Sequence, residues 1–278
     1  MSISTWLITG ASSGLGYALA EHVLKQGDQV VLAARTVASM ETLAASYPNT
    51  ALAVGLDVSN PQQRVAAVRQ AETRFGAIDF LVNNAGIDFL GAIEEQDEAD
   101  YRKIFEVNFF GAVALLRLAL PAMRARGRGM IVNMSSMDGI ASLPVNGFYS
   151  ASKFALEGMT EALWQEIEPL GLRAMLIEPG SFRTGIGGRT KFSGQKIDDY
   201  VATSGAFREA MANVGDHMFP GDPARAANAI YTTLKSGSKA HRLILGADAY
   251  RNIGAKINDL LADCEASRDM AHSTDFAA

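Results

Sequence analysis

The chain is poor in cysteine and has no excess of basic residues. Cys264 is its single cysteine, so no disulfide can form within the chain. A lone cysteine is typical of a reducing compartment, and we expect a cytoplasmic protein. The 25 Lys and Arg residues are outnumbered by 30 Asp and Glu, for a net charge of -5. This balance predicts no broad basic face, and we therefore expect no nucleic-acid partner.

Long apolar runs are also missing. The longest run, residues 109–123, contains Arg117 and Pro121 and is shorter than the roughly 20 residues that span a bilayer. The N-terminus has no positively charged region of the kind that begins a signal peptide, and it leads directly into an expected strand. We expect neither a targeting segment nor a membrane partner.

Short apolar runs alternate with amphipathic segments along most of the chain. The expected strands are Thr5–Thr9, Gln29–Ala34, Ala51–Leu56, Phe80–Asn83, Met130–Met134, Arg173–Ile177 and His241–Leu245. The expected helices are Leu15–Gln26, Pro61–Phe75, Asp97–Arg124, Phe148–Glu168 and a segment from Asp222-Pro223 to Lys235. Near-continuous apolar strands are typical of parallel sheets buried on both faces. The alternation predicts a Rossmann-type α/β fold, with a doubly wound seven-stranded parallel sheet and helices on both faces.

The whole chain, residues 1–278, is expected to form one domain, because no repeat or low-complexity linker interrupts it. Two segments depart from the strand–helix pattern. Residues 181–219 hold six glycines and few strand signals, and we interpret them as a mobile lid over the substrate. Residues 247–278 are expected to form a helical extension, with a helix at Asp248–Arg268 followed by a loose tail.

A glycine-rich turn, Thr9-Gly10-Ala11-Ser12-Ser13-Gly14-Leu15-Gly16, follows the first expected strand and opens the first helix. Gly10 permits the tight turn, Gly14 lets the backbone approach a pyrophosphate, and Gly16 allows close packing of helix on sheet. The helix N-terminus then presents free N–H groups to the phosphates. A purely structural turn would also use glycines, but the strand before and the helix after favour a nucleotide site.

The end of the second expected strand bears on the choice of nicotinamide cofactor. Enzymes that use NAD usually place an acid here, whereas this chain has Arg35, which can bind a 2′-phosphate. We therefore expect NADP, with NAD as the alternative because arginine also stacks on adenine. Ser12 could add a hydroxyl to the 2′-phosphate. Asp57 either bonds the adenine edge or serves as a turn residue.

Tyr149 and Lys153 are four residues apart at the start of an expected helix, so they share one face of it. A nearby ammonium favours the phenolate, which would lower the pKa of Tyr149 from about 10 and let it exchange a proton with an alcohol. Such pairs are common on solvated helix faces, but this one follows the fifth expected strand, at the sheet edge where ligands bind. Ser135 and Ser136 end that strand, and either hydroxyl could donate to a substrate oxygen.

Together these residues resemble the short-chain dehydrogenase/reductase family over about residues 3–246. The turn matches the family's wider glycine spacing, and Asn83-Asn84-Ala85-Gly86 matches its NNAG motif. The other matching residues are Asn108, Ser136, the Tyr149/Lys153 pair, and Pro179-Gly180 with Thr184. More narrowly, residues 177–184 and the long tail resemble bacterial members similar to hydroxysteroid and retinol dehydrogenases.

The resemblance implies an NAD(P)-dependent oxidoreductase that transfers hydride between nicotinamide C4 and a carbonyl/alcohol pair. Ser136 would polarise the carbonyl and Tyr149 would be the general acid/base. Lys153 would bind the nicotinamide ribose and lower the tyrosine pKa, and Asn108 would hold a water that relays protons to it. The implied cofactor-lining residues are Gly10, Ser13, Gly14, Leu15, Gly16, Asp57, Val58, Asn84, Ala85, Gly86, Pro179, Gly180 and Thr184. No metal is expected.

Substrate and assembly are less constrained by the sequence. The aromatic and methionine residues Phe182, Phe192, Phe207, Met211, Met218 and Phe219 of the lid, with Met137 and Phe148, favour an apolar ketone, aldehyde or secondary alcohol, although such residues are also ordinary core. Arg183, Arg189 and Lys191 could instead meet an anionic group. In family members that end near the last strand the C-terminus helps to form a tetramer, so the extension favours a homodimer.

Two rival classes use the same scaffold. One is an NADP-binding regulator that senses cofactor without turnover, although such proteins typically lose the catalytic tyrosine or lysine. The other is a lyase, epimerase or dehydratase. Sugar-nucleotide epimerases of this type usually carry a larger C-terminal domain and tighter glycine spacing, and this chain has neither.

Overall fold

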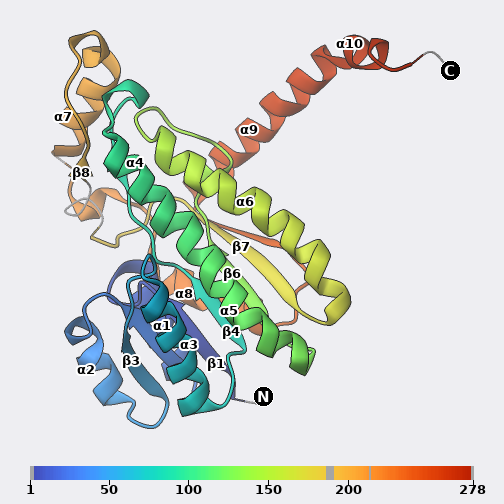
Figure 1. Ribbon diagram of the computed structural model, residues 1–278. Coiled ribbons are helices and arrows are strands. Elements are labelled where there is room, and N and C mark those ends of the chain that lie inside the picture. Colours follow the sequence, from blue (N-terminus) through green and yellow to red (C-terminus); the bar gives the residue numbers. More distant parts are fainter. Residues whose placement is uncertain (1–2, 186–190, 213, 277–278) are drawn as a thin grey trace.

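The computed structural model describes residues 3–185, 191–212 and 214–276. A seven-stranded, wholly parallel sheet forms its centre, in the order β3-β2-β1-β4-β6-β7-β9 (Figure 1). The strands are β1 (Thr5–Thr9), β2 (Gln29–Ala34), β3 (Ala51–Gly55), β4 (Phe80–Asn83), β6 (Met130–Met134), β7 (Arg173–Pro179) and β9 (Arg242–Leu245). The expected doubly wound sheet is confirmed, with strand ends shifted by at most two residues.

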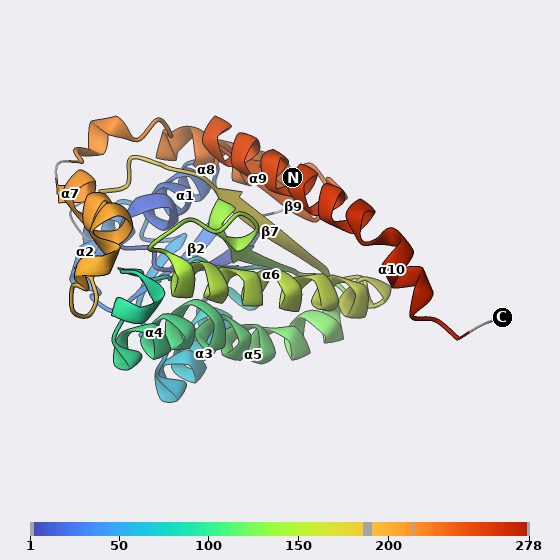
Figure 2. The same cartoon turned by 90° about the horizontal axis from the view of Figure 1, so that it is seen from above.

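Helices cover both faces of the sheet, as Figure 2 shows. One face carries α1 (Gly14–Lys25), α2 (Ala38–Ser46) and α8 (Pro223–Lys235), and the other carries α3 (Pro61–Phe75), α5 (Gly111–Arg126) and α6 (Gly147–Ile167). Successive side chains of a strand point to opposite faces, so Trp6 and Ile8 join one hydrophobic cluster and Leu7 the other. Strands buried on both faces explain why their sequences are almost continuously apolar.

Two helix starts follow from the residues before them. Asn60 accepts a hydrogen bond from the Gln63 N–H at 3.0 Å, and Pro61 occupies the first position of α3. Asp222 caps α8 in the same way, accepting from Ala224 N–H at 2.8 Å, with Pro223 first in the helix. Both helix starts were predicted from the sequence. The polar cap accepts from an N–H group that the first turn leaves unpaired, and proline at the first position has no N–H group to satisfy.

The expected helix Asp97–Arg124 is interrupted. It consists of α4 (Glu98–Phe105), a π-helical turn η2 (Glu106–Phe110) and α5 (Gly111–Arg126). By length and composition alone, the run Glu98–Arg126 could cross a membrane, which is weak evidence because core helices of soluble proteins pass the same test. Here α5 packs on α3 and contributes Leu115, Leu116 and Met123 to the core.

The lid contains more regular structure than the sequence predicts. Its residues Lys191–Phe192 form β8, which pairs in parallel with β5 (Phe89–Leu90). The other lid elements are η5 (Asp198–Tyr200), η6 (Val201–Gly205), α7 (Ala206–Ala212) and η7 (Asp216–Met218). At the base of the lid, Phe182 forms a parallel bridge with Gly221. Arg189, one of the three cations considered for an anionic substrate, lies outside the described residues.

The remaining elements are short helices and the C-terminal extension. They are η1 (Ile93–Glu95), η3 (Met137–Gly139), η4 (Glu168–Leu170), α9 (Ala247–Ala266) and α10 (Arg268–Ser273). The start of α9 packs beside η3, where Ala249 and Ile253 contact Met137. Its second half and α10 project away from the body of the molecule (Figure 1). The expected helical extension is therefore present, with the helix Asp248–Arg268 ending at Ala266.

Candidate active site

The glycine turn connects β1 to α1 at the carboxyl edge of the sheet. Gly10 and Gly14 have φ of +66° and +61°, which side chains with a Cβ rarely adopt. A Cβ on Gly16 would lie 2.6 Å from the Gly10 carbonyl oxygen, so Gly16 is needed for the first turn of α1 to approach the loop. The three glycines thus serve the backbone geometry expected of them, and the turn places the α1 N-terminus where a phosphate could bind.

Asn84 supports this turn from the end of β4. Its side-chain N–H group donates to the carbonyl oxygens of Thr9 (2.8 Å) and Gly10 (3.3 Å). The Thr9 hydroxyl accepts from the backbone N–H groups of Asn84 (2.9 Å) and Ala85 (3.0 Å). The NNAG residues and the glycine turn are therefore one hydrogen-bonded unit, and Asn84 positions the turn through its amide.

The residues expected at the adenosine end lie at the ends of β2 and β3. Arg35 directly follows β2 and is exposed. The Asp57 carboxylate accepts from the Ser59 N–H (2.9 Å) and hydroxyl (2.6 Å), which lower its pKa. Of the two roles considered for Asp57, the turn role is therefore present in the structure. Val58 is buried and packs against Gly111 of α5.

Pro179 and Gly180 lie where β7 ends, and Thr184 follows. Gly180 N–H donates to Leu245 O at 2.8 Å, and Ser181 N–H donates to the Asp248 carboxylate at 2.8 Å. A Cβ on Gly180 would come within 2.3 Å of that carboxylate. The start of α9 therefore fixes the backbone at this point, a link between extension and site that the sequence did not predict.

The catalytic candidates converge at the carboxyl end of β6. The Ser136 side chain lies close enough to Tyr149 to lower its pKa, and the Lys153 Nζ atom lies 5.5 Å from the centroid of the tyrosine ring. Lys153 is buried and donates to the carbonyl oxygen of Met134, at the last residue of β6, at 2.8 Å. The serine that acts on the tyrosine is Ser136, the residue that matches the family motif, and not Ser135.

Asn108 lies in the π-helical turn η2, and both the oxygen and the nitrogen of its side-chain amide form hydrogen bonds. It accepts from the Ile87 N–H at 2.8 Å and donates to the Ile87 carbonyl oxygen at 2.9 Å and to the Ser152 hydroxyl at 3.1 Å. A Cβ on Gly86 would be 3.5 Å from the Asn108 Oδ1 atom and 3.7 Å from the Lys153 Nζ atom. Asn108, Gly86 and Lys153 thus lie around one point, beside Tyr149.

The pKa of Tyr149 differs from the sequence expectation. Burial, followed by the negative charges of Asp138 and Asp88, raises this pKa above its ordinary value, although the hydrogen bond from Ser136 opposes the shift. Burial also lowers the pKa of Lys153 to about 8. The tyrosine is therefore a phenol at neutral pH, and neither its burial nor the two nearby carboxylates were part of the sequence expectation.

Behind Lys153, a charged network connects α6 to the edge strand. Glu157, one helical turn after Lys153, bonds to Arg242 of β9, which also bonds to the fully buried Glu178 and to Glu161. Burial raises the pKa of Glu157 to about 7 despite the arginine. Because the Glu157 charge also acts on Lys153, this network contributes to the electrostatic environment of the lysine.

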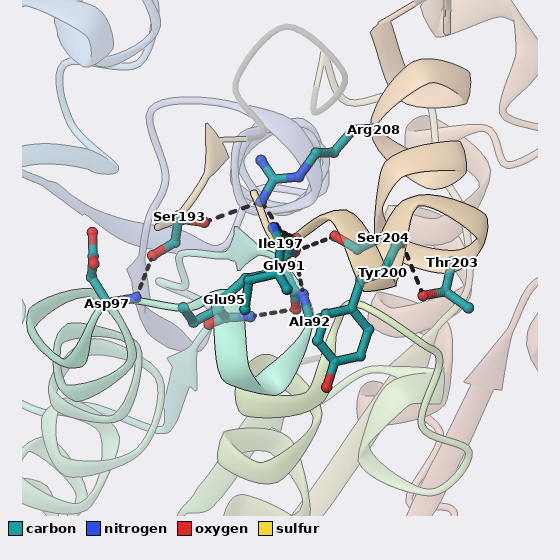
Figure 3. Close-up of polar contacts among 11 residues, drawn as sticks. Gly91, Ala92, Glu95, Asp97, Ser193, Ile197, Tyr200, Thr203, Ser204 and Arg208 are labelled. Carbon is teal, nitrogen blue, oxygen red and sulfur yellow. Dashed lines mark hydrogen bonds and ion pairs between the residues drawn. The ribbon is translucent and has the colours of Figure 1, made fainter. Parts of the chain in front are cut away.

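A second network fixes the lid to the segment that follows β5, and Figure 3 shows it. The buried Glu95 carboxylate accepts from the backbone N–H groups of Ala92 (3.0 Å) and Ile197 (3.1 Å). It also accepts from the Ser204 hydroxyl and from Arg208 (3.3 Å). These donors outweigh the desolvation of the carboxylate and lower its pKa to about 2. Glu95 was not a candidate from the sequence, because only the folded chain brings residues 197–208 to it.

Two further carboxylates, Asp88 and Asp138, were also missed. Asp88 follows the NNAG motif and Asp138 lies two residues after Ser136. Burial, followed by repulsion from Asp138, raises the pKa of Asp88 to about 7, and burial raises that of Asp138 to about 6. Their positions next to the NNAG motif and Ser136 could have marked both carboxylates as candidate site residues. Within the described part of the chain, no group of three or more His, Cys, Asp or Glu residues could hold a metal ion.

Comparison with known proteins assigns the family. Residues 4–192 match the family model described as short chain dehydrogenase. The chain therefore belongs to the short-chain dehydrogenase family and is an oxidoreductase. A short-chain dehydrogenase from Streptomyces avermitilis has a similar crystal structure, with a TM-score of 0.92 and 38% sequence identity over 99% of this chain and 100% of that one. The similarity includes the C-terminal extension.

Two more relatives bear on activity and cofactor. The 3-alpha-(or 20-beta)-hydroxysteroid dehydrogenase of Mycobacterium bovis is 35% identical over 178 residues, which are 64% of this chain and 68% of that protein. The 3-ketoacyl-(acyl-carrier-protein) reductase of Brucella melitensis, solved with NADH, is 27% identical, with a TM-score of 0.71 over 87% of this chain and 96% of that one. The expected family resemblance is confirmed, and a nicotinamide cofactor is supported.

Proposed function

We propose that this chain is an NADP-dependent carbonyl reductase that uses Tyr149 as its proton donor. The observation that carries the proposal is the position of Tyr149 close to Ser136 and to the buried Lys153, at the carboxyl end of β6, which β4 separates from β1 and its glycine turn. The raised pKa of Tyr149 keeps its proton available for a carbonyl oxygen at neutral pH.

The residues fit a bound nicotinamide cofactor, whose chemistry is to supply or accept a hydride. The left-handed backbone of Gly10 and Gly14 and the start of α1 would hold its phosphates, and the exposed Arg35 would bind the 2′-phosphate of NADP. Ser12, Ser13, Leu15 and Gly16 belong to the same turn. Asn84, Ala85, Gly86, Pro179, Gly180 and Thr184 would line the rest of the site.

The chain's own residues then handle the proton and the orientation of the carbonyl. Ser136 donates to the carbonyl oxygen and holds it beside the Tyr149 hydroxyl, which gives up its proton. Lys153, anchored on Met134, places a positive charge close to the tyrosine ring. Asn108 fixes the Ile87 backbone, next to Gly86 and Lys153.

Replacement of Tyr149 by Phe tests the proposal. This substitution removes the hydroxyl but keeps the ring, so NADPH binding is retained and ketone reduction falls about 10²- to 10⁴-fold. NADPH binding is measured by quenching of tryptophan fluorescence, and reduction by the loss of nicotinamide absorbance. Near-full activity in the variant would contradict the role of Tyr149.

Cofactor preference has a separate test, Arg35→Asp. The new carboxylate repels a 2′-phosphate but not a 2′-hydroxyl, so we expect the Kd for NADPH to rise at least about 10-fold more than that for NADH. An unchanged ratio of the two dissociation constants would show that Arg35 does not select the cofactor.

An NADP sensor without turnover is not favoured, because Asn108, Ser136, Tyr149 and Lys153 are all present and close together. The apolar substrate class is supported by the relative named for hydroxysteroids. A cytoplasmic location and a homodimer stay predictions of the sequence.

A further inference from the structure

Asp138 is a buried carboxylate with one unused oxygen. It lies two residues after Ser136, and its N–H donates to the Ser136 hydroxyl oxygen at 3.1 Å, so its backbone is fixed to the candidate catalytic serine. Its Oδ2 atom accepts from Asn146 Nδ2 at 2.6 Å. Its Oδ1 atom has no hydrogen-bond partner among the described residues, although the side chain is only 6% exposed. A buried carboxylate oxygen without a donor is unfavourable unless a ligand supplies one.

Asp88 reaches the same place from another element. It follows Ile87, whose backbone is fixed by Asn108, and its carboxylate accepts the Phe89 N–H. Its Oδ1 atom is also buried, and nothing in the described part of the chain donates to it. The charge of Asp138 acts on Asp88, and the charges of both carboxylates act on Tyr149 and Lys153. The two carboxylates therefore lie near the candidate catalytic pair.

A third acceptor adjoins them. Asn146 donates a hydrogen bond from Nδ2 to Asp138. The Oδ1 atom of Asn146 is buried and has no hydrogen-bond partner within residues 3–185, 191–212 and 214–276. The nearby ammonium of Lys153 is already hydrogen-bonded to Met134 O at 2.8 Å. The three unpaired atoms are thus all hydrogen-bond acceptors, two of them on carboxylates.

We propose that Asp88, Asp138 and Asn146 form a subsite for a protonated primary amine of the substrate, close to the carbonyl group that is reduced. An ammonium group carries three N–H donors and a positive charge, which match three acceptors and two carboxylates. A hydroxyl group offers a single donor and no charge. The inference rests on the proposed reductase function and narrows its substrate class from apolar ketones to amino ketones with an apolar remainder.

The subsite also predicts a pH dependence. Burial, followed by repulsion from Asp138, raises the pKa of Asp88 to about 7, and burial raises that of Asp138 to about 6, so near neutral pH the pair retains part of a proton. Binding of an ammonium group displaces that proton, and binding therefore strengthens as pH rises from 6 to 8. Tyr149 and Lys153 lie near the same pair. The charged form of Lys153, whose burial lowers its pKa to about 8, repels the ammonium group, so its loss of a proton as pH rises strengthens binding in the same direction.

The test uses the full chain with NADPH and three matched ketones. Each is a phenyl ketone whose alkyl chain ends in CH₂NH₃⁺, CH₂OH or CH₂CH₃, at two chain lengths. We expect kcat/KM for the ammonium ketone to exceed that for the ethyl ketone by about 10- to 100-fold, with the hydroxyl ketone much closer to the ethyl one. The ratio of ammonium to ethyl ketone rises between pH 6 and pH 8.

Variants locate the effect. Asp88→Asn and Asp138→Asn each remove one charge at almost constant shape, and each lowers the ammonium-to-ethyl ratio of kcat/KM by about 10-fold or more. Asp259→Asn removes an exposed carboxylate of α9 and leaves the ratio unchanged. If an active-site variant does not fold, the pH dependence of the wild-type ratio decides instead.

The outcomes separate the two proposals. Reduction of the ethyl ketone without preference for the ammonium ketone at either chain length overturns the amine subsite alone. A preference that survives in both Asn variants, or a ratio that does not change with pH, also overturns it. Failure to oxidise NADPH with any ketone overturns the reductase function, and the subsite with it.

Discussion

Glu95 and Asp88 lie in the same connection between β4 and α4, on either side of β5, yet their surroundings are opposite. Glu95 receives four donors, two of them backbone N–H groups, and its pKa falls to about 2. Asp88 receives the Phe89 N–H and lies near a second carboxylate, and its pKa rises to about 7. Glu95 is buried, and Asp88 is half-buried with its Oδ1 atom enclosed, so the supply of donors decides which of the two carboxylates is stable in its charged form.

The difference separates structural from functional roles. A carboxylate whose charge is fully paired holds two parts of a chain together, as Glu95 holds the lid to the segment after β5. A buried carboxylate left short of donors costs folding free energy, and such a cost is typical of sites that bind something else. Asp88 and Asp138, near Tyr149, each have one oxygen without a donor among the described residues, whereas Glu95 receives four donors.

The largest expected effect is that of Glu95→Ala. It leaves Arg208, the Ser204 hydroxyl and two N–H groups without their acceptor, which destabilises the anchored lid by about 3–5 kcal/mol. We expect faster hydrogen exchange in residues 191–208 and a higher KM for ketone substrates. Glu94→Ala is the matched control, because Glu94 is exposed and accepts a single hydrogen bond among the described residues, from the Tyr200 hydroxyl at 3.0 Å. Equal exchange rates in the two variants would show that Glu95 does not anchor the lid.

Asp88→Asn is expected to act in the opposite direction. Removing an ionised carboxylate that lacks donors raises the free energy of unfolding at pH 7.5 by about 1–3 kcal/mol. Thermal unfolding measures this gain, with Asp259→Asn as the control that changes nothing. A variant less stable than the wild type would mean that Asp88 is paired in solution, and that the contrast with Glu95 is wrong.

The smallest expected effect is the change in these free energies of unfolding between pH 7.5 and pH 5. The folded pKa of Asp88, about 7, lies above its ordinary value of 3.8, so its penalty is complete above pH 7 and disappears as pH falls towards 3.8. The folded pKa of Glu95, about 2, lies below 4.5, so its contribution is complete above pH 4.5 and is lost only as pH falls towards 2. At pH 5 the gain from Asp88→Asn should therefore shrink, while the loss from Glu95→Gln persists. Unfolding curves of both variants and the wild type at pH 5 and 7.5 would show it.

The sheet and its nucleotide turn were predictable because each depends on local sequence. Apolar runs such as Thr5–Thr9 and Met130–Met134 have few alternatives to a buried strand, and the cap at Asn60-Pro61 fixes a helix start. The π-helical turn at Asn108 was not predictable, because its one-residue shift leaves the apolar pattern of the helix almost unchanged.

The site was predictable to the extent that its residues lie at motif positions. Ser136, Tyr149 and Lys153 come together as expected, whereas the direction of the Tyr149 pKa shift was wrong, since it depends first on burial and then on Asp138 and Asp88. Contacts between segments that are distant in the chain could not be predicted from the sequence. The pairing of β5 with β8 and the Glu95 network join residues about a hundred positions apart, and no local pattern encodes them.

The bridge between Phe182 and Gly221 closes the lid at its base, where Arg183 N–H donates to Gly221 O at 2.9 Å and Gly221 N–H donates to Ser181 O at 3.0 Å. The sheet and the candidate catalytic residues lie outside this closed loop. Because each doubling of loop length costs only about 0.6 kcal/mol of loop-closure entropy, the length of the lid could change between these two points while the sheet and the candidate catalytic residues keep their places. The energetic cost of such a change would come from the contacts that the lid makes with Glu95 and β5.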